Sequence, residues 1–358
     1  MSYKNYESKP QFLSKGVVLC QPGLWCSADT YTPMWNTLNK IANKTTIDLS
    51  SKVLMSTNIN NEEIINELNS KKGNGKITFF KTLFTNVIGR VDDQADELYK
   101  IIIKIKSVFG EDIPIFLVGY SKGGLVNMRF ATKYQGIATN ITSIGTPYHN
   151  SFLQKVLSIL DDIVKNVSIM SVDGVKQLID LAYKKLDECV SDEDLGSDAF
   201  FTKLKTEWSR VTKKPYITCI ICSQIGFTSN SYGGSDLVVD ASAQRADGFS
   251  NINERILIDD NYEYLVRENW WDYLYMCTSV HALEILENVT WGIAEAISRG
   301  DFLYALLAFS LALIPYTWDI GKYDLIHTQE LINQNVCKAV LSAINKSNPN
   351  ISGGYYNG

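Results

Sequence analysis

Short apolar runs alternate along the chain with longer segments whose apolar residues recur every three or four positions. The short runs are rich in branched or aromatic side chains and predict buried strands at residues 16–20, 76–80, 113–118, 141–147, 216–225 and 255–259. Residues 92–108 show the apolar spacing of a helix that packs on one face. Strands that alternate with amphipathic helices predict an α/β protein with a mostly parallel central sheet flanked by helices.

A helical block interrupts this alternation between residues 152 and 210. We therefore divide the chain into one half of the core (1–150), a helical cap or lid insertion (151–212) and the other half of the core (213–358). The last part contains an apolar helical insertion at about 260–322. Its most apolar stretch, 302–316, is too short to span a membrane and ends near Pro315, so it predicts a buried helix or a lid.

The most specific motif follows the predicted strand at 113–118. Residues 119–123 read Gly-Tyr-Ser-Lys-Gly, and an amphipathic segment, 125–134, comes directly after them. A strand, a sharp turn at a serine and a helix form a nucleophile elbow, which holds the hydroxyl clear of the sheet at the positive end of a helix. Ser121 is therefore the candidate nucleophile. Its neighbour Lys122 is expected to face solvent, with attraction of acidic substrate groups as the alternative role.

A serine nucleophile needs a base, and histidine has the ordinary pKa for that role near neutral pH. The chain has three histidines, at 149, 281 and 327. The apolar spacing that follows His327 predicts a helix that packs its loop onto the sheet, so His327 is the favoured base. His281 stays open as the alternative, because His327 requires a long insertion after the acidic residue.

An acidic side chain must then hold the imidazole in the correct tautomer. Asp236 follows a turn at residues 232–235 and precedes two valines. Asp240 and Asp247 are nearby competitors for the same role. We favour Asp236 as the acid.

The net charge and the spacing of the cysteines bear on possible partners and cofactors. The net charge is −5 and the basic residues form no stripe, which argues against nucleic acid as a partner. Cys219 and Cys222 form a C-x-x-C within a predicted strand, where side chains three positions apart face opposite sides, so we interpret them as buried apolar groups and not as a zinc or redox pair. No metal or cofactor is expected.

The sequence also bears on localisation. No stretch of 18 or more apolar residues predicts a membrane span. Residues 1–11 are polar and lack the apolar region of a signal peptide. We expect a cytoplasmic protein, or a secreted one if a leader has been removed.

Several motifs together resemble the lipase and esterase branch of the α/β-hydrolase family, in its bacterial-type serine lipases. Residues 17–24 are similar to the first strand and oxyanion loop, with Pro22 in place of the usual histidine. Residues 144–149 are similar to the strand exit Gly-Thr-Pro-His with one residue added. Further similarities are a loop after the cap, the Asp-Gly-x-Val segment of the acid and the histidine loop, at 194–201, 235–239 and 323–327. The motifs occur in the family order Ser, Asp, His between about 16 and 345.

This resemblance implies an α/β-hydrolase fold with a helical cap, and a serine hydrolase that cleaves carboxylic esters, either lipids or other acyl esters. It implies the triad Ser121, Asp236 and His327, and an oxyanion hole made by the backbone N–H groups of Leu24 and Lys122. It also implies contact with a lipid interface through the cap. An acyltransferase or thioesterase with the same triad, and a hydrolase-like binding protein without catalysis, stay open as alternatives.

Overall fold

The computed structural model describes residues 15–24, 26–42, 44–87, 89–149, 198–223, 225–226, 234–235, 239, 241–259 and 330–347. The strands in these ranges are β1 (Gly16–Gln21), β2 (Ile47–Leu54), β3 (Ile77–Thr82), β4 (Ile115–Tyr120), β5 (Asn140–Ile144), β6 (Tyr216–Ser223), β7 (Ile225–Gly226), β8 (Gly234–Ser235) and β9 (Glu254–Asp259). The helices are the 3-10 turn η1 (Ala28–Tyr31), α1 (Thr32–Ile41), α2 (Glu62–Lys71), α3 (Val91–Phe109), α4 (Lys122–Lys133), α7 (Asp198–Ser209), α8 (Ala241–Gln244) and α14 (Gln334–Lys346).

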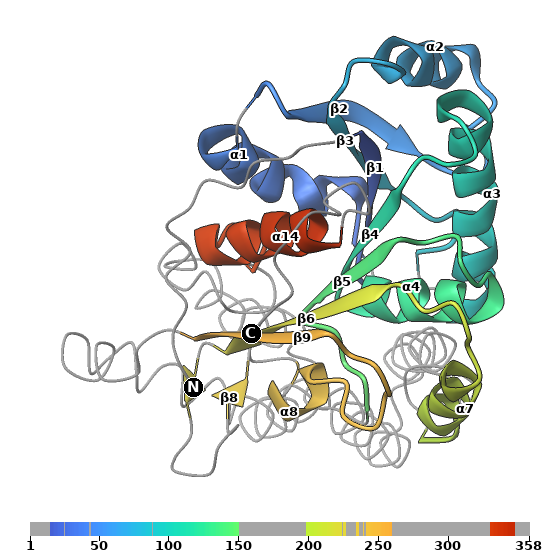
Figure 1. The fold of residues 1–358 in the computed structure, drawn as a ribbon. Coiled ribbons are helices and arrows are strands. Elements are labelled where there is room, and N and C mark those ends of the chain that lie inside the picture. The colour runs from blue at the N-terminus through green and yellow to red at the C-terminus, as the bar shows by residue number, and fades with distance from the viewer. Residues whose placement is uncertain are drawn as a thin grey trace, which may run out of the picture.

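Seven of the strands form one sheet in the order β2-β3-β1-β4-β5-β6-β9 (Figure 1). Every neighbouring pair in it is parallel, so the prediction of a mostly parallel sheet is confirmed. β7 and β8 form a separate antiparallel pair. Because all seven strands run the same way, their carboxyl ends lie along one edge of the sheet, and β4 ends at the middle of that edge.

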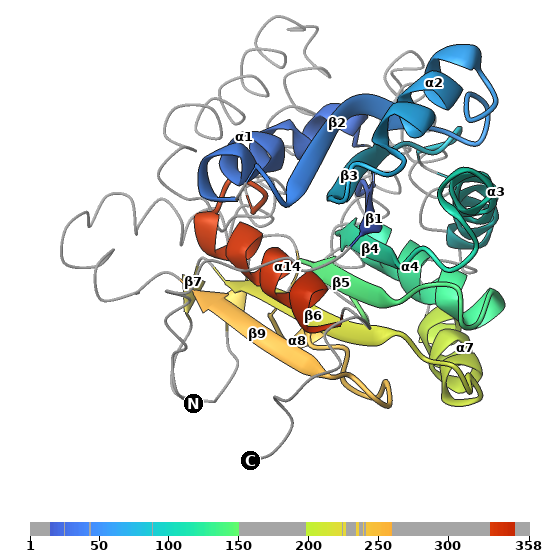
Figure 2. The same cartoon turned by 45° about the horizontal axis from the view of Figure 1, so that its top comes forward.

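Helices cover both faces of the sheet, and each face has its own apolar core. α1 and α14 lie side by side on one face, whereas α3, α4 and α7 lie on the other (Figures 1 and 2). Successive side chains of β1 point to opposite faces of the sheet, so Val17 and Leu19 belong to one core and Val18 and Cys20 belong to the other. Two separately filled cores are what a buried parallel sheet requires.

The two cysteines of the C-x-x-C segment follow this division. Cys219 lies in the core beneath α3 and α4, and Cys222 lies in the core beneath α1 and α14. Both are free thiols with no exposed surface. Burial raises the pKa of the Cys219 thiol to about 11, so it stays protonated at neutral pH. The interpretation of this pair as buried apolar groups is confirmed.

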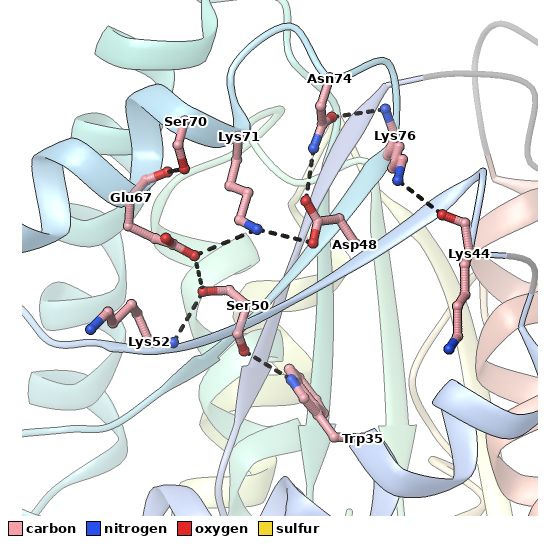
Figure 3. Close-up of polar contacts among 10 residues, drawn as sticks. All are labelled: Trp35, Lys44, Asp48, Ser50, Lys52, Glu67, Ser70, Lys71, Asn74 and Lys76. Carbon is pink, nitrogen blue, oxygen red and sulfur yellow. Dashed lines mark hydrogen bonds and ion pairs between the residues drawn. The ribbon is translucent and has the colours of Figure 1, made fainter.

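Polar contacts hold the edge strand β2 to helix α2 and to α1 (Figure 3). The hydroxyl of Ser50 donates to Glu67 Oε1 over 2.7 Å, and the ammonium of Lys71 lies 3.1 Å from Asp48 Oδ1. The indole Nε1 of Trp35 donates to the backbone oxygen of Ser50 over 2.9 Å. These bonds fix a strand that pairs with the sheet along one side only.

The predicted cap lies mostly outside the described residues, since the description resumes at 198. Helix α7 lies at the end of the predicted cap, 151–212, and its Leu204 and Trp208 pack in the core beside α4. The apolar insertion at about 260–322 also falls outside the description. Of the helices that are described, none has the length and apolar character to cross a bilayer. Nor do the described side chains include a group of three or more His, Cys, Asp or Glu residues that could bind a metal ion.

Candidate active site

Ser121 occupies a sharp turn between β4 and α4, as the elbow motif predicts. Its backbone angles are φ 53° and ψ −126°, the values of the first central residue in a type II′ turn. A residue other than glycine rarely adopts a positive φ, and such strain occurs mainly at functional sites. The residue is partly exposed and directly precedes the first turn of α4, where the helix dipole favours negative charge.

Two glycines allow this turn to pack as tightly as it does. A Cβ atom on Gly119 would lie 2.4 Å from the carbonyl carbon of Gly123, so strand and helix could not approach each other with a larger residue there. A Cβ atom on Gly123 would lie 2.4 Å from the carbonyl oxygen of Gln21, at the end of β1. The flanking glycines of the motif are therefore required by contact with the backbone on both sides.

Neighbouring strands hold the backbone of Ser121 in place. Its N–H donates to the carbonyl oxygen of Ile144 over 2.8 Å. Its carbonyl oxygen accepts a bond of 2.9 Å from the hydroxyl of Thr146 and one of 3.0 Å from the N–H of Gly124. The strained residue is thus fixed from β5 as well as from its own helix, which preorganises the hydroxyl.

The loop after β1 lies beside the serine, where the sequence places the oxyanion loop. A Cβ atom on Gly23 would lie 2.9 Å from the Cβ of Ser121. The next residue, Leu24, is half-buried and packs against the core under α3 and α4. The hydroxyl of the buried Tyr31 donates to the carbonyl oxygen of Gln21 over 2.8 Å and so fixes the start of this loop. Leu24 and Ser121 are therefore brought close together.

Lys122 differs from its prediction. Only 1% of its surface is exposed, and its ammonium donates to the carbonyl oxygen of Gly89 in the loop between β3 and α3. The expectation of a solvent-facing side chain is wrong, because the first turn of α4 is pressed against the loop after β1 and not open to water. This placement also leaves little support for direct contact between Lys122 and an acidic substrate group.

The predicted triad partners fall outside the description. Asp236, His281, His327 and the competing Asp240 all lie there. Asp247 is described, and its carboxylate lies 3.4 Å from Arg245 Nε and 3.8 Å from Arg255 Nη2. Asp247 lies between α8 and β9 in the chain, and its described ion-pair partners are Arg245 and Arg255.

The described residues next to the predicted partners reach the same sheet edge as Ser121. Ser235, which precedes Asp236, pairs with Ile225 just beyond the carboxyl end of β6. Glu330, three positions after His327, is buried against Gly145, where a Cβ atom would lie 2.3 Å from its Oε2. Gly145 directly follows β5, the neighbour of β4.

His149 lies at the exit of β5, as its motif predicts. Its Nε2 is 3.1 Å from the carbonyl oxygen of Ser242. A carbonyl oxygen can only accept, so Nε2 carries the proton and donates. This bond ties the strand exit to α8.

Two contributors to the site, Tyr31 and Glu330, carry no motif of their own in the sequence, whereas Thr146 belongs to the strand-exit motif at 144–149. Tyr31 and Thr146 brace the oxyanion loop and the elbow, and Glu330 is a fully buried carboxyl group beside the exit of β5. Glu330 directly precedes Leu331, which begins the apolar pattern of the predicted last helix, so the sequence places it close to the sheet. The bonds of Tyr31 to the carbonyl oxygen of Gln21 and of Thr146 to that of Ser121 are made to backbone atoms, and no local pattern reveals them.

The strand order, the parallel sheet and the elbow after its middle strand define an α/β-hydrolase core. No protein-family model matches the chain, and no curated protein does. Among solved structures, the chain is similar to the lin2722 gene product of Listeria innocua, at 13% identity and a TM-score of 0.42, over 70% of this chain and 86% of that one. It is also similar to the lipase BlEst2 of Bacillus licheniformis in its mature form, at 16% identity and a TM-score of 0.39, over 75% and 94% of the two chains. A third is a putative cell surface hydrolase of Lactobacillus plantarum, at 11% identity and a TM-score of 0.42, over 69% and 82%.

Proposed function

We propose that this protein is a serine hydrolase that cleaves carboxylic esters, of lipids or of other acyl compounds. The observation that carries the proposal is the backbone of Ser121, a residue other than glycine held at φ 53° between a strand and the start of a helix. Contacts from β1, β5 and α4 maintain this strain, and the partly exposed residue lies at the positive end of a helix.

In the proposed reaction, Ser121 Oγ attacks the ester carbonyl carbon while His327 takes the hydroxyl proton. The carbonyl oxygen becomes an oxyanion, held by the N–H groups of Leu24 and Lys122. Collapse of this intermediate breaks the bond to the alcohol oxygen, which receives the proton from His327. Water then attacks the acyl-enzyme with the same histidine as base, which releases the acid and restores the serine. Asp236 orients the imidazole throughout.

The positions of the described neighbours support this triad. Ser235 and Glu330 lie at the carboxyl edge of the sheet, where Ser121 also lies. Asp236 directly follows Ser235, and His327 lies three positions before Glu330, which supports their assignment to the triad. The helical cap predicted over residues 151–212, apart from α7, which packs on the core beside α4, and its contact with lipid remain part of the proposal.

Replacement of the triad residues tests the proposal on p-nitrophenyl esters of increasing chain length. Ser121→Ala and His327→Ala should each lower kcat by at least about a thousandfold, as deletions from such triads do. Asp236→Ala should also lower kcat strongly, because the imidazole would lose its orienting partner. His281→Ala serves as the matched histidine control and should keep most of the activity. Circular dichroism of each variant checks that it is folded.

Several results would contradict parts of this proposal. Loss of activity in His281→Ala alone would make His281 the base. A preference for acetate over longer acyl groups would argue against lipid esters. If a fluorophosphonate probe fails to label Ser121 in folded protein, the binding-protein alternative is correct. Product analysis with competing alcohols and thiols separates a hydrolase from an acyltransferase or thioesterase.

A further inference from the structure

The ammonium group of Lys122 is an unusual neighbour for a catalytic serine. Its side chain has only 1% of its surface exposed, although lysine is almost never fully buried. The backbone N–H of the same residue is the proposed oxyanion donor. We propose that the buried charge of Lys122 stabilises the oxyanion from beneath the site and fixes the loops that form it. This inference rests on the proposed function.

Covalent geometry limits how far this charge can be from the reaction. The Nζ of a lysine lies at most roughly 6 Å from its own Cα, whatever rotamer it adopts. An oxyanion bound to the N–H of Lys122 therefore forms within about 10 Å of the ammonium. Charges interact more strongly in a site shielded from water than in bulk solvent, so a cation at this distance favours the negatively charged intermediate over the neutral ester.

The contact with Gly89 gives the direction of the side chain. Gly89 lies in the loop after β3, and β3 is separated from β4 by β1 in the sheet. Gly89 also stands just before α3, which packs directly on α4, so the side chain runs from the start of α4 towards the start of α3. The ammonium is therefore held in the protein interior beside the first turn of α4, which the loop after β1 also contacts through Gly123.

The acceptor loop is itself held firmly, so the charge has a defined position. The N–H of Thr85 donates to Glu97 Oε2 over 2.9 Å, and the amide of Gln94 donates to the carbonyl oxygen of Asn86 over 2.8 Å. The N–H of Gly89 donates to the same oxygen of Asn86 over 3.0 Å. A cation fixed in this way needs little rearrangement when the oxyanion forms, which is the condition for efficient electrostatic catalysis.

The structure offers a matched control on the same helix. Lys133 Nζ pairs with Asp96, so this lysine also joins α4 to α3, but it is partly exposed. It lies 11 positions after Lys122, about 16 Å along the helix axis. Removal of Lys133 eliminates a cation and a contact between α3 and α4 without changing the charge near Ser121.

The experiment compares wild type with Lys122→Met, Lys122→Gln, Lys133→Met and Ser121→Ala. A p-nitrophenyl ester gives kcat and KM, and an alkyl trifluoromethyl ketone, which forms an anionic adduct with serine, gives an inhibition constant. Lys122→Met should lower kcat about tenfold, or about 1.4 kcal/mol of transition-state stabilisation. KM should stay within about twofold, and inhibition should weaken by a factor similar to that in kcat. Lys122→Gln should behave in the same way, because a neutral amide keeps a donor but not the charge.

The inhibition constant separates this role from a merely structural one. Methionine removes the bond to Gly89 together with the charge, so Lys122→Met should melt below wild type, and all variants are assayed at a temperature at which circular dichroism shows them folded. The inference is wrong if Lys122→Met matches Lys133→Met in kcat, if the loss appears in KM, or if Lys122→Gln is fully active. In each of these cases Ser121→Ala still reports on the proposed function. A wild type no faster than Ser121→Ala would overturn both proposals.

Discussion

At the scale of single residues, Ser121 combines a functional position with a stability cost. Its φ of 53° and ψ of −126° are strained for any residue with a Cβ atom. Hydrogen bonds from Ser121 to Ile144 and from Thr146 and Gly124 to Ser121 hold it there. The surrounding fold therefore stabilises a conformation that the serine alone would avoid.

We predict that Ser121→Gly is more stable than Ser121→Ala by about 1 kcal/mol. Both variants lack the hydroxyl, but only glycine is unstrained at this φ, and the relief exceeds the entropy that glycine adds to the unfolded chain. Urea denaturation of the two inactive variants measures the difference. Equal stabilities would mean that the turn is not strained at residue 121.

The sequence predicted some residues of the site better than others. The sharp turn at Ser121 was predicted because the elbow is a local pattern of strand, turn and helix. The burial of Lys122 was missed because it depends on the loops after β1 and β3, which come from distant parts of the sequence. A motif predicts the backbone path of a neighbouring residue, but it does not predict what surrounds the side chain of that residue.

At the scale of elements, six of the seven strands of the main sheet were predicted, including the edge strand β9, and the other edge strand, β2, was not. Strands β1, β3, β4, β5, β6 and β9 coincide with the predicted apolar runs, and α3 with the predicted helix. β2 was missed because an edge strand carries polar residues such as Asp48 and Ser50, and these residues show no apolar run. α1 and α2, which flank β2, were missed as well.

We predict that Trp35→Phe lowers the free energy of unfolding by about 1–2 kcal/mol. Phenylalanine keeps the apolar contact of α1 with the sheet but loses the 2.9 Å bond to the carbonyl oxygen of Ser50. The carbonyl oxygen, buried on the edge strand, would lose this donor. Chemical denaturation measures the change, and unaltered stability would show that water replaces the indole donor at this edge.

At the scale of the whole molecule, Arg129 joins three helices on one face of the sheet. Its guanidinium on α4 pairs with Asp92 on α3 and with Glu207 on α7, 37 and 78 positions away in the sequence. Burial opposes the charge, but the hydrogen bonds and charges of the two carboxylates outweigh it and raise the pKa of Arg129. The pairs fix α7 in the layer that covers the core.

We predict that Arg129→Met lowers the free energy of unfolding by about 2 kcal/mol. The change leaves two half-buried carboxylates without their shared cation. Lys133→Met, which breaks a more exposed pair on the same helix, should change stability by no more than about 0.5 kcal/mol. Similar effects of the two variants in chemical denaturation would show that burial does not distinguish these pairs.

The sequence predicted those features of the overall architecture that depend on the order of helices and strands along the chain. Alternation of strands and helices predicted a parallel sheet, and the odd offset of Cys219 and Cys222 predicted their opposite faces. The order of strands across the sheet, with β1 between β3 and β4, could not be predicted, because it depends on pairing between distant segments. The cap and the triad partners remain predictions.

Helix α14 has a consequence for how the protein is made. One side of the sheet is closed by α1 from early in the chain and by α14 from residues more than 200 positions after β4. During synthesis, the apolar side chains of Val118 and Ile220 therefore remain exposed on this face until residue 346 has left the ribosome and α14 can pack. Nascent chains of this protein should depend on chaperones more than their finished product does.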